Sequence, residues 1–241
     1  MARPKRGSPA YWEAWEKKQL LGLRSPEQRE IMKRYFEFTP EKRGCSRKVK
    51  EMSNKEYVDK VWAKISTSVG HQRALQKLGL HESQANEIKP VLFWGFVKDK
   101  DDPAIFKKAG CTYTSRIEVT WLFFGDEELS IYKCIFDMVY DTQTEDTIDY
   151  FYTDITAFES KSVLDEFAIT VAGKGCRSKK LSKEKVFVKT NIFSVVVPGD
   201  NFTCSMTNNP EMEAKIQGMK QILREKKREG TDGHFSAFKR Q

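Results

Sequence analysis

One segment of the sequence concentrates residue types that contact phosphates or carboxylates. Glycines at 173 and 175 lead into a run of positive side chains: Lys174, Arg177, Lys179, Lys180, Lys183 and Lys185. Lysine and arginine at this density can bind the phosphates of a nucleic acid or an acidic protein surface. The segment lacks the Gly-x-x-x-x-Gly-Lys-Ser/Thr pattern of a nucleotide-binding loop. We therefore predict a basic hairpin loop that contacts a partner, with a plain solvated loop as the alternative.

The sequence gives less support to a catalytic acid-base site or a metal site. The three histidines, His71, His81 and His234, are far apart and lack the spacing of a metal motif. The carboxylates that could act as acid or base belong mostly to a predicted hairpin tip, where water solvates them. They are Asp137, Asp141, Glu145, Asp146, Asp149 and Asp154. The sequence thus predicts a protein that is not an enzyme and has no catalytic, cofactor or metal site.

The cysteines and the hydropathy of the sequence indicate in which cellular compartment the protein is located. The five cysteines, Cys45, Cys111, Cys134, Cys176 and Cys204, are odd in number and include no Cys-x-x-Cys pair. The basic residues 1–7 are not followed by the apolar segment of a secretion signal. The longest apolar stretch, residues 90–97, is too short to span a bilayer. These features predict a reducing, cytoplasmic location without a transmembrane segment.

The sequence of the first 89 residues predicts helices. Serine-proline pairs at 8–9 and 25–26 and a capping box at 53–56 are typical helix starts, and Gly70 and Gly79 bracket a short helix over 71–78. A weaker start lies at 39–40. The two helices after residue 53 could form a helix-turn-helix with Gln72, Arg73 and Gln76 facing bases. An ordinary packed pair is favoured, because the intervening turn is long.

The rest of the chain predicts antiparallel strands and one final helix. A buried strand over 91–97 precedes a meander, whose strands are expected over 112–124, 129–141 and 148–160, with turns at 125–128 and 142–146. Shorter strands are expected over 167–172, 186–189, 192–197 and 202–206. Met212, Ile216, Met219 and Leu223 then recur at helical spacing. This order predicts a domain over 90–227, after a helical region over 1–89 and before a flexible tail over 228–241.

Charge is unevenly distributed along the chain. Residues 1–89 carry 20 Lys and Arg against 11 Asp and Glu, residues 90–160 carry 6 against 14, and residues 161–241 carry 16 against 9. The whole chain has a net charge of +8. An acidic sheet between two basic segments suggests either charge complementarity within the chain or basic faces for an anionic partner.

About seven antiparallel strands followed by one amphipathic helix resemble a pleckstrin-homology-like (PH-like) domain. The segment 150–158, Tyr-Phe-Tyr-Thr-Asp-Ile-Thr-Ala-Phe, is similar to an aromatic-x-Asp-Ile-x-x-aromatic strand of bacterial members. The resemblance implies an α+β fold in which a C-terminal helix closes a bent antiparallel β-barrel. Eukaryotic members bind phosphoinositides through the first strand loop, which here would be residues 98–108. Its three aspartates would repel a phosphorylated headgroup.

We therefore expect a non-enzymatic interaction protein that binds a macromolecule through basic surfaces or an exposed sheet edge. A protein partner is favoured and anionic lipid headgroups are disfavoured. The alternative is a nucleic-acid-binding regulator or accessory factor that uses the basic N-terminal helices. No cofactor is expected.

Overall fold

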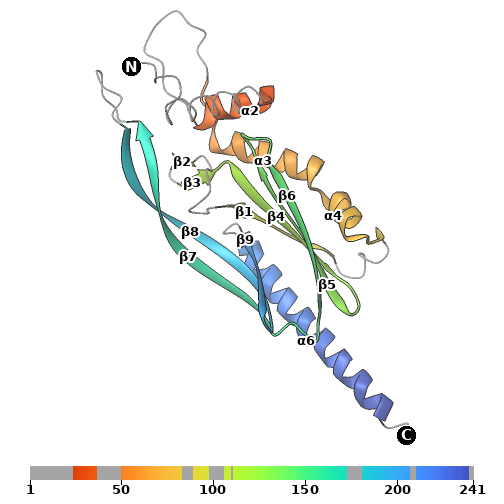
Figure 1. Ribbon diagram of the computed structural model, residues 1–241. Coiled ribbons are helices and arrows are strands. Elements are labelled where there is room, and N and C mark those ends of the chain that lie inside the picture. Colours follow the sequence, from red (N-terminus) through yellow and green to blue (C-terminus); the bar gives the residue numbers. More distant parts are fainter. Residues whose placement is uncertain are drawn as a thin grey trace, which may run out of the picture.

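The computed structural model describes residues 24–36, 50–82, 89–97, 106–109, 111–172, 181–206 and 210–238, and has an α+β architecture with antiparallel sheets (Figure 1). The helices are α2 (Pro26–Ile31), a π-helix η1 (Met32–Phe36), α3 (Asn54–Ser68), α4 (His71–Leu78) and α6 (Pro210–Phe238). The strands are β1 (Val91–Phe96), β2 (Phe106–Ala109), β3 (Cys111–Thr114), β4 (Arg116–Phe124), β5 (Glu128–Asp137), β6 (Gln143–Phe151), β7 (Ala157–Ala172), β8 (Leu181–Val197) and β9 (Asp200–Met206).

The N-terminal helices begin and end where the capping residues predict. Ser25 and Gln28 form a capping box at the start of α2, and the Ser53 hydroxyl accepts a hydrogen bond from the Glu56 amide at the start of α3. Helix α4 ends at Gly79, whose φ of 69° suits glycine. The predicted helices at these three places are therefore confirmed. The helices expected from residues 8 and 39 lie outside the described residues.

The described strands form separate sheets and do not close into a barrel through backbone ladders. The larger sheet has the order β1-β4-β5-β6, a second sheet has the order β7-β8-β9, and β2 and β3 form a short hairpin. All of these pairings are antiparallel. The predicted α+β class with antiparallel strands is thus found, whereas ladder closure of the predicted barrel is not.

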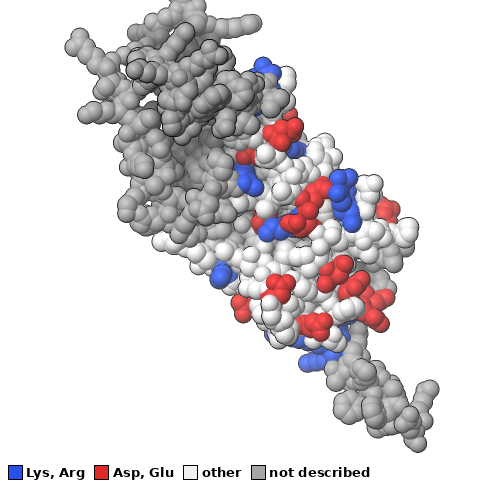
Figure 2. Space-filling view, in the orientation of Figure 1, with Lys and Arg blue, Asp and Glu red and all other residues white. Residues whose placement is uncertain are grey.

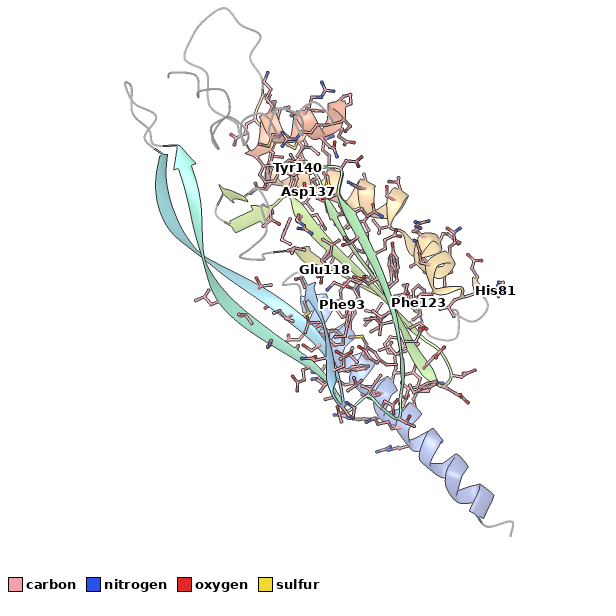
Figure 3. All side chains as sticks on the ribbon, in the orientation of Figure 1. His81, Phe93, Glu118, Phe123, Asp137 and Tyr140 are labelled. Atoms are coloured by element: carbon pink, nitrogen blue, oxygen red, sulfur yellow. The ribbon has the colours of Figure 1, made fainter. Side chains whose placement is uncertain are left out.

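The four-stranded sheet separates two apolar cores. On one face, Tyr57, Val61 and Ile65 of α3 pack with Val119 and Phe123 of the sheet. The core on the other face contains Phe93 and Leu122 from the same sheet, Phe193 and Val195 from β8, and Ile216, Met219 and Leu223 from α6. Phe93 and Phe123 mark these two cores in Figure 3. The N-terminal helices therefore cover one face of the sheet, while α6 and the second sheet cover the other.

Several strand boundaries differ from the sequence prediction. The turn after β5 lies at residues 138–142, not 142–146, and β6 already begins at Gln143. The buried Asp137 carboxylate causes this early turn, because its Oδ1 accepts hydrogen bonds from the amides of Val139 and Tyr140. Residues 152–156, expected inside a strand, connect β6 to β7.

Two elements are longer than the sequence predicts. β8 passes without a break through Thr190 and Asn191, where a turn is expected. Helix α6 continues to Phe238, although the sequence predicts a tail without periodicity from residue 228. Across the described parts of the chain, no helix has the length and apolar character needed to cross a membrane.

Candidate interaction edge

Strand β6 is the outer strand of the four-stranded sheet. Its register with β5 runs from Phe136 opposite Gln143 to Glu128 opposite Phe151, and β5 is its only neighbour among the described strands. An antiparallel strand directs its backbone N–H and C=O groups alternately to its two sides. The side of β6 that faces away from β5 therefore presents a row of backbone groups suited to a further strand.

Side chains fix β6 to the domain from within the sheet. Ile148 and Tyr150 are half-buried and pack against the core that contains α6. The Tyr150 hydroxyl donates a 2.8 Å hydrogen bond to Asp200, the first residue of β9. Burial and this bond to Asp200 raise the pKa of Tyr150 to about 12. The strand is thus held in an extended conformation before any partner binds, which lowers the entropic cost of adding one.

Glu145 connects β6 to helix α4. Arg73 donates to both carboxylate oxygens at 3.2 Å, Lys77 lies 2.6 Å from Oε2, and the Tyr132 hydroxyl donates to Oε1 at 2.9 Å. Burial opposes ionisation of Glu145, but the hydrogen bonds from Lys77, Arg73 and Tyr132 outweigh it and lower its pKa to about 2. The cluster makes α4 a fixed cover on one face of the sheet.

The same cluster bears on the helix-turn-helix alternative. Arg73 is bound to Glu145, and the Gln72 side chain donates to Glu82 within the same helical region. Trp121 of β4 donates to the Val69 carbonyl between α3 and α4. These contacts engage the Arg73 and Gln72 side chains within the protein and attach α4 to the sheet, but none of them joins α3 to α4, so the choice between the two alternatives stays a prediction.

Acidic side chains predominate along the exposed edge. Asp141, Asp146, Asp149 and Asp154 are all exposed and lie on β6 or in the turns at its two ends. Figure 2 shows acidic groups gathered over the lower part of the visible face, where β6 and the β4–β5 turn lie in Figure 1. Neither Asp146 nor Asp149 has an ion pair with any residue that the structure describes. The edge therefore carries uncompensated negative charge.

One large apolar side chain is exposed at the end of the edge. Phe151, the last residue of β6, is 54% exposed, and only three large hydrophobic residues are exposed in the described part of the chain. An exposed aromatic residue beside an open strand can pack against the side chains of an added strand. The edge thus combines backbone groups, negative charge and one apolar contact point.

The basic loop predicted as the partner site falls mostly outside the described residues. Lys174, Arg177, Lys179 and Lys180 belong to residues 173–180, which the structure does not describe. Lys183 and Lys185 lie in β8 opposite Thr170 and Ala168, and only their backbone positions are described. Their role in binding stays a prediction.

The remaining side chains that could react, those of Asp137, Cys134 and Cys204, are buried. The Asp137 carboxylate, expected at a solvated tip, is 2% exposed and accepts from the Ser115 hydroxyl at 2.9 Å. Burial raises the pKa of the Cys134 thiol to about 11 and raises that of Cys204 further. Within the described segments, no group of three or more His, Cys, Asp or Glu side chains could hold a metal ion.

Comparison with known proteins gives no relative for this chain. No protein-family model matches its sequence, no curated protein matches it, and no solved structure matches its fold.

The sequence predicts an exposed sheet edge but does not locate it on β6. Residues 142–146 are predicted to form a turn, whereas β6 already begins at Gln143. The alternation of half-buried Ile148 and Tyr150 with exposed Thr147 and Asp149 marks the second half. Residues 143–147 are all polar and do not continue this alternation, so the first half of β6 lacks that signal. The remaining signal is Asp137, since aspartate is a typical first residue of a turn.

Proposed function

We propose that this chain is a non-enzymatic interaction protein, built on a PH-like scaffold, that binds an extended segment of another protein along β6. The observation that carries the proposal is the position of β6 at the edge of the larger sheet, with β5 alone as its described neighbour. A partner that adds a strand gains main-chain hydrogen bonds along the whole edge, and its alternate side chains determine specificity.

The PH-like part of the proposal is supported by the order of the elements. A four-stranded antiparallel sheet is followed along the chain by a three-stranded one and then by a C-terminal helix. Ile216, Met219 and Leu223 of that helix are buried in the core that both sheets share. The burial of this helix against both sheets supports the PH-like part of the proposal.

The charge of the edge indicates a basic partner. Asp146 and Asp149 lie on opposite faces of β6, since they are three positions apart and successive side chains of a strand alternate between its faces. A partner strand with Lys or Arg at facing positions would place opposite charges across the pair on both faces, and such pairs contribute about 0.2–1 kcal/mol each. A second copy of β6 would instead oppose its own aspartates. The edge thus favours a basic segment over self-association.

Two other binding modes depend in part on residues that the structure does not describe. The basic-loop version uses Lys174, Arg177, Lys179, Lys180, Lys183 and Lys185, and the nucleic-acid version uses the basic N-terminal region 1–89, of which residues 24–36, 50–82 and 89 are described. The sign of the ligand separates the nucleic-acid version from the edge, because a polyanion should bind basic residues with a steep salt dependence, whereas the acidic edge should repel it.

The edge can be tested with three matched peptides. The first is a fluorescent peptide of about ten residues that alternates Lys with Thr and Val, the second replaces Lys by Glu, and the third carries N-methyl groups on every residue, which blocks both sides of the strand. We expect the basic peptide to bind, as measured by fluorescence anisotropy, and the other two to bind at least about tenfold more weakly. Methylation leaves the charge intact but removes main-chain donors, so unchanged affinity of the third peptide would contradict strand addition.

Protein variants locate the binding. Reversing both edge charges (Asp146→Lys with Asp149→Lys) should weaken binding of the basic peptide and strengthen binding of the acidic one. The control is Asp59→Lys, which reverses an exposed charge on α3, away from the edge. Equal effects of the edge and control variants would show that net charge, and not β6, attracts the peptide.

A further inference from the structure

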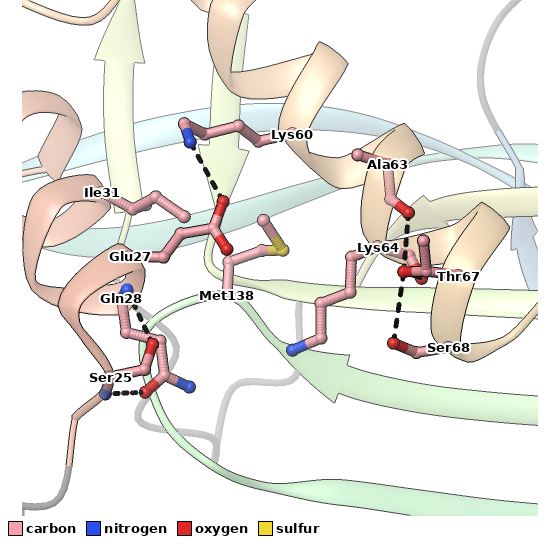
Figure 4. Close-up of a pocket in the computed structure, with 10 residues that line it drawn as sticks. All are labelled: Ser25, Glu27, Gln28, Ile31, Lys60, Ala63, Lys64, Thr67, Ser68 and Met138. Carbon is pink, nitrogen blue, oxygen red and sulfur yellow. Dashed lines mark hydrogen bonds and ion pairs between the residues drawn. The ribbon is translucent and has the colours of Figure 1, made fainter.

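A polar cavity lies between the N-terminal helices α2 and α3. In contrast to the acidic edge, its lining includes two lysines, Lys60 and Lys64. Its volume is about 410 Å³. Helices α2 and α3 form its walls, and Met138 from the β5–β6 turn contributes to its floor. Figure 4 shows the cavity with Lys60 and Lys64 on one side and Gln28 on the other.

Lys64 is held so that its ammonium group points into this cavity (Figure 4). Its Nζ donates a 2.9 Å hydrogen bond to the Asp137 carbonyl and lies 4.8 Å from the centre of the Phe136 ring. These contacts fix the end of the side chain but use only one of its three N–H donors. Burial lowers the pKa of Lys64, so an anion that replaces the lost hydration would be favoured.

Gln28 presents a second donor because of its role in the helix cap. Its Oε1 accepts from the Ser25 amide at 2.8 Å, which completes the capping box of α2. The side-chain NH₂ of Gln28 is therefore turned away from the cap and toward the cavity, as Figure 4 shows. No hydrogen bond of this NH₂ group is found among the described residues.

The other residues that line the cavity determine its net charge and its apolar surface. Lys60 pairs with Glu27 at 3.0 Å, so these two charges offset each other. Among the residues that line the cavity, Lys64 is then the charged group without an ion pair, although the nearby carboxylates of Asp137 and Asp141, which are not part of the lining, also attract it. Ile31, Ala63 and Met138 add apolar surface next to the two donors. One positive charge, a neutral donor and an apolar wall match a ligand with one carboxylate and an apolar chain.

We infer that this cavity binds a small organic carboxylate, whose oxygens accept hydrogen bonds from Lys64 Nζ and Gln28 Nε2 while its apolar chain contacts Ile31 and Met138. The inference is independent of the proposed strand partner, because none of these residues lies on β6. A divalent anion would leave negative charge unpaired in the cavity, so carboxylate is favoured over phosphate.

The test uses the full chain and simple probes. Acetate, butyrate and hexanoate are titrated at constant ionic strength by calorimetry, with 1-hexanol and inorganic phosphate as comparison ligands. We expect saturable binding at one site that tightens from acetate to hexanoate, with 1-hexanol and phosphate at least about tenfold weaker. Absence of saturable carboxylate binding would overturn the inference, and so would equal binding of 1-hexanol or phosphate.

Two variants assign the site. Gln28→Glu keeps an acceptor for the Ser25 amide, so the helix cap remains, but it replaces the donor by a negative charge. Lys64→Met keeps the apolar stem and removes the ammonium group. Each should weaken hexanoate binding by about tenfold or more, whereas Lys55→Met, an exposed position of the same helix, should leave it unchanged. Binding that survives Gln28→Glu with the cap intact would contradict the assignment, even if Lys64→Met failed to fold.

Discussion

The Glu118 carboxylate on β4 accepts a hydrogen bond from the Ser205 backbone amide on β9 at 2.5 Å. This bond joins the two sheets at a place where no backbone ladder connects them. Lys133 of β5 lies 2.9 Å from the other carboxylate oxygen and donates to the Thr203 carbonyl at 3.0 Å. A buried acid and its lysine thus replace ladder hydrogen bonds along the junction of the sheets.

The close approach of β1 to β9 at this junction predicts that Gly95→Ala destabilises the fold. A Cβ atom at position 95 would lie 2.8 Å from the Ser205 Cβ and 3.0 Å from its carbonyl carbon. We expect a loss of about 1–3 kcal/mol in the free energy of unfolding, measured by urea denaturation. Gly218→Ala in α6 is the control, since a Cβ there meets nothing within 4 Å. It should stabilise the protein by about 0.5–1 kcal/mol.

The pairing of Glu118 with Lys133 predicts energetic coupling between these residues. Glu118 is 6% exposed, so replacing either partner alone leaves a polar or charged group poorly compensated. A double-mutant cycle with Glu118→Gln and Lys133→Gln should give an interaction energy of about 0.5–3 kcal/mol. Strictly additive losses in unfolding free energy would mean that the pair does not join the sheets.

The contacts of Glu145 predict a stability change in acid. Its pKa is held at about 2, below the ordinary value of 4.5, so its contribution is fully present above pH 4.5 and is lost as the pH falls toward 2. Glu145→Gln should therefore lower stability at neutral pH by about 1–3 kcal/mol and flatten the acid part of the stability profile. Asp149→Asn, an exposed neighbour on β6, should leave that profile unchanged. The measurement is denaturant unfolding across pH 2 to 6.

Sequence patterns predicted the local structure better than the long-range structure. Ser25, Ser53 and Gly79 determine helix ends through contacts with residues three or four positions away, so a local pattern contains the whole interaction. The turn after β5 depends instead on Asp137, whose burial requires Ser115 of the preceding strand region. The contact between Glu118 and Ser205 spans distant strands, and no local spacing could reveal it.

Burial of Tyr57 predicts a further test of how α3 is attached. Its hydroxyl donates a 2.8 Å hydrogen bond to the Thr114 carbonyl and the residue is fully buried. Tyr57→Phe should cost about 1–3 kcal/mol in thermal or urea unfolding, because it leaves a buried carbonyl without its donor. In Tyr140→Phe the ring under the Arg24 guanidinium is retained, and we expect little change. Similar losses in the two variants would argue against the specific bond.

Amide hydrogen exchange along β6 tests the central proposal most directly. In the free protein, alternate amides of residues 143–151 should exchange fast, because only those that face β5 are paired. Saturation with the alternating basic peptide should slow the fast-exchanging amides by about tenfold or more while the rest of the sheet changes little. Unchanged exchange in β6, or new protection confined to residues 181–185, would contradict strand addition at this edge.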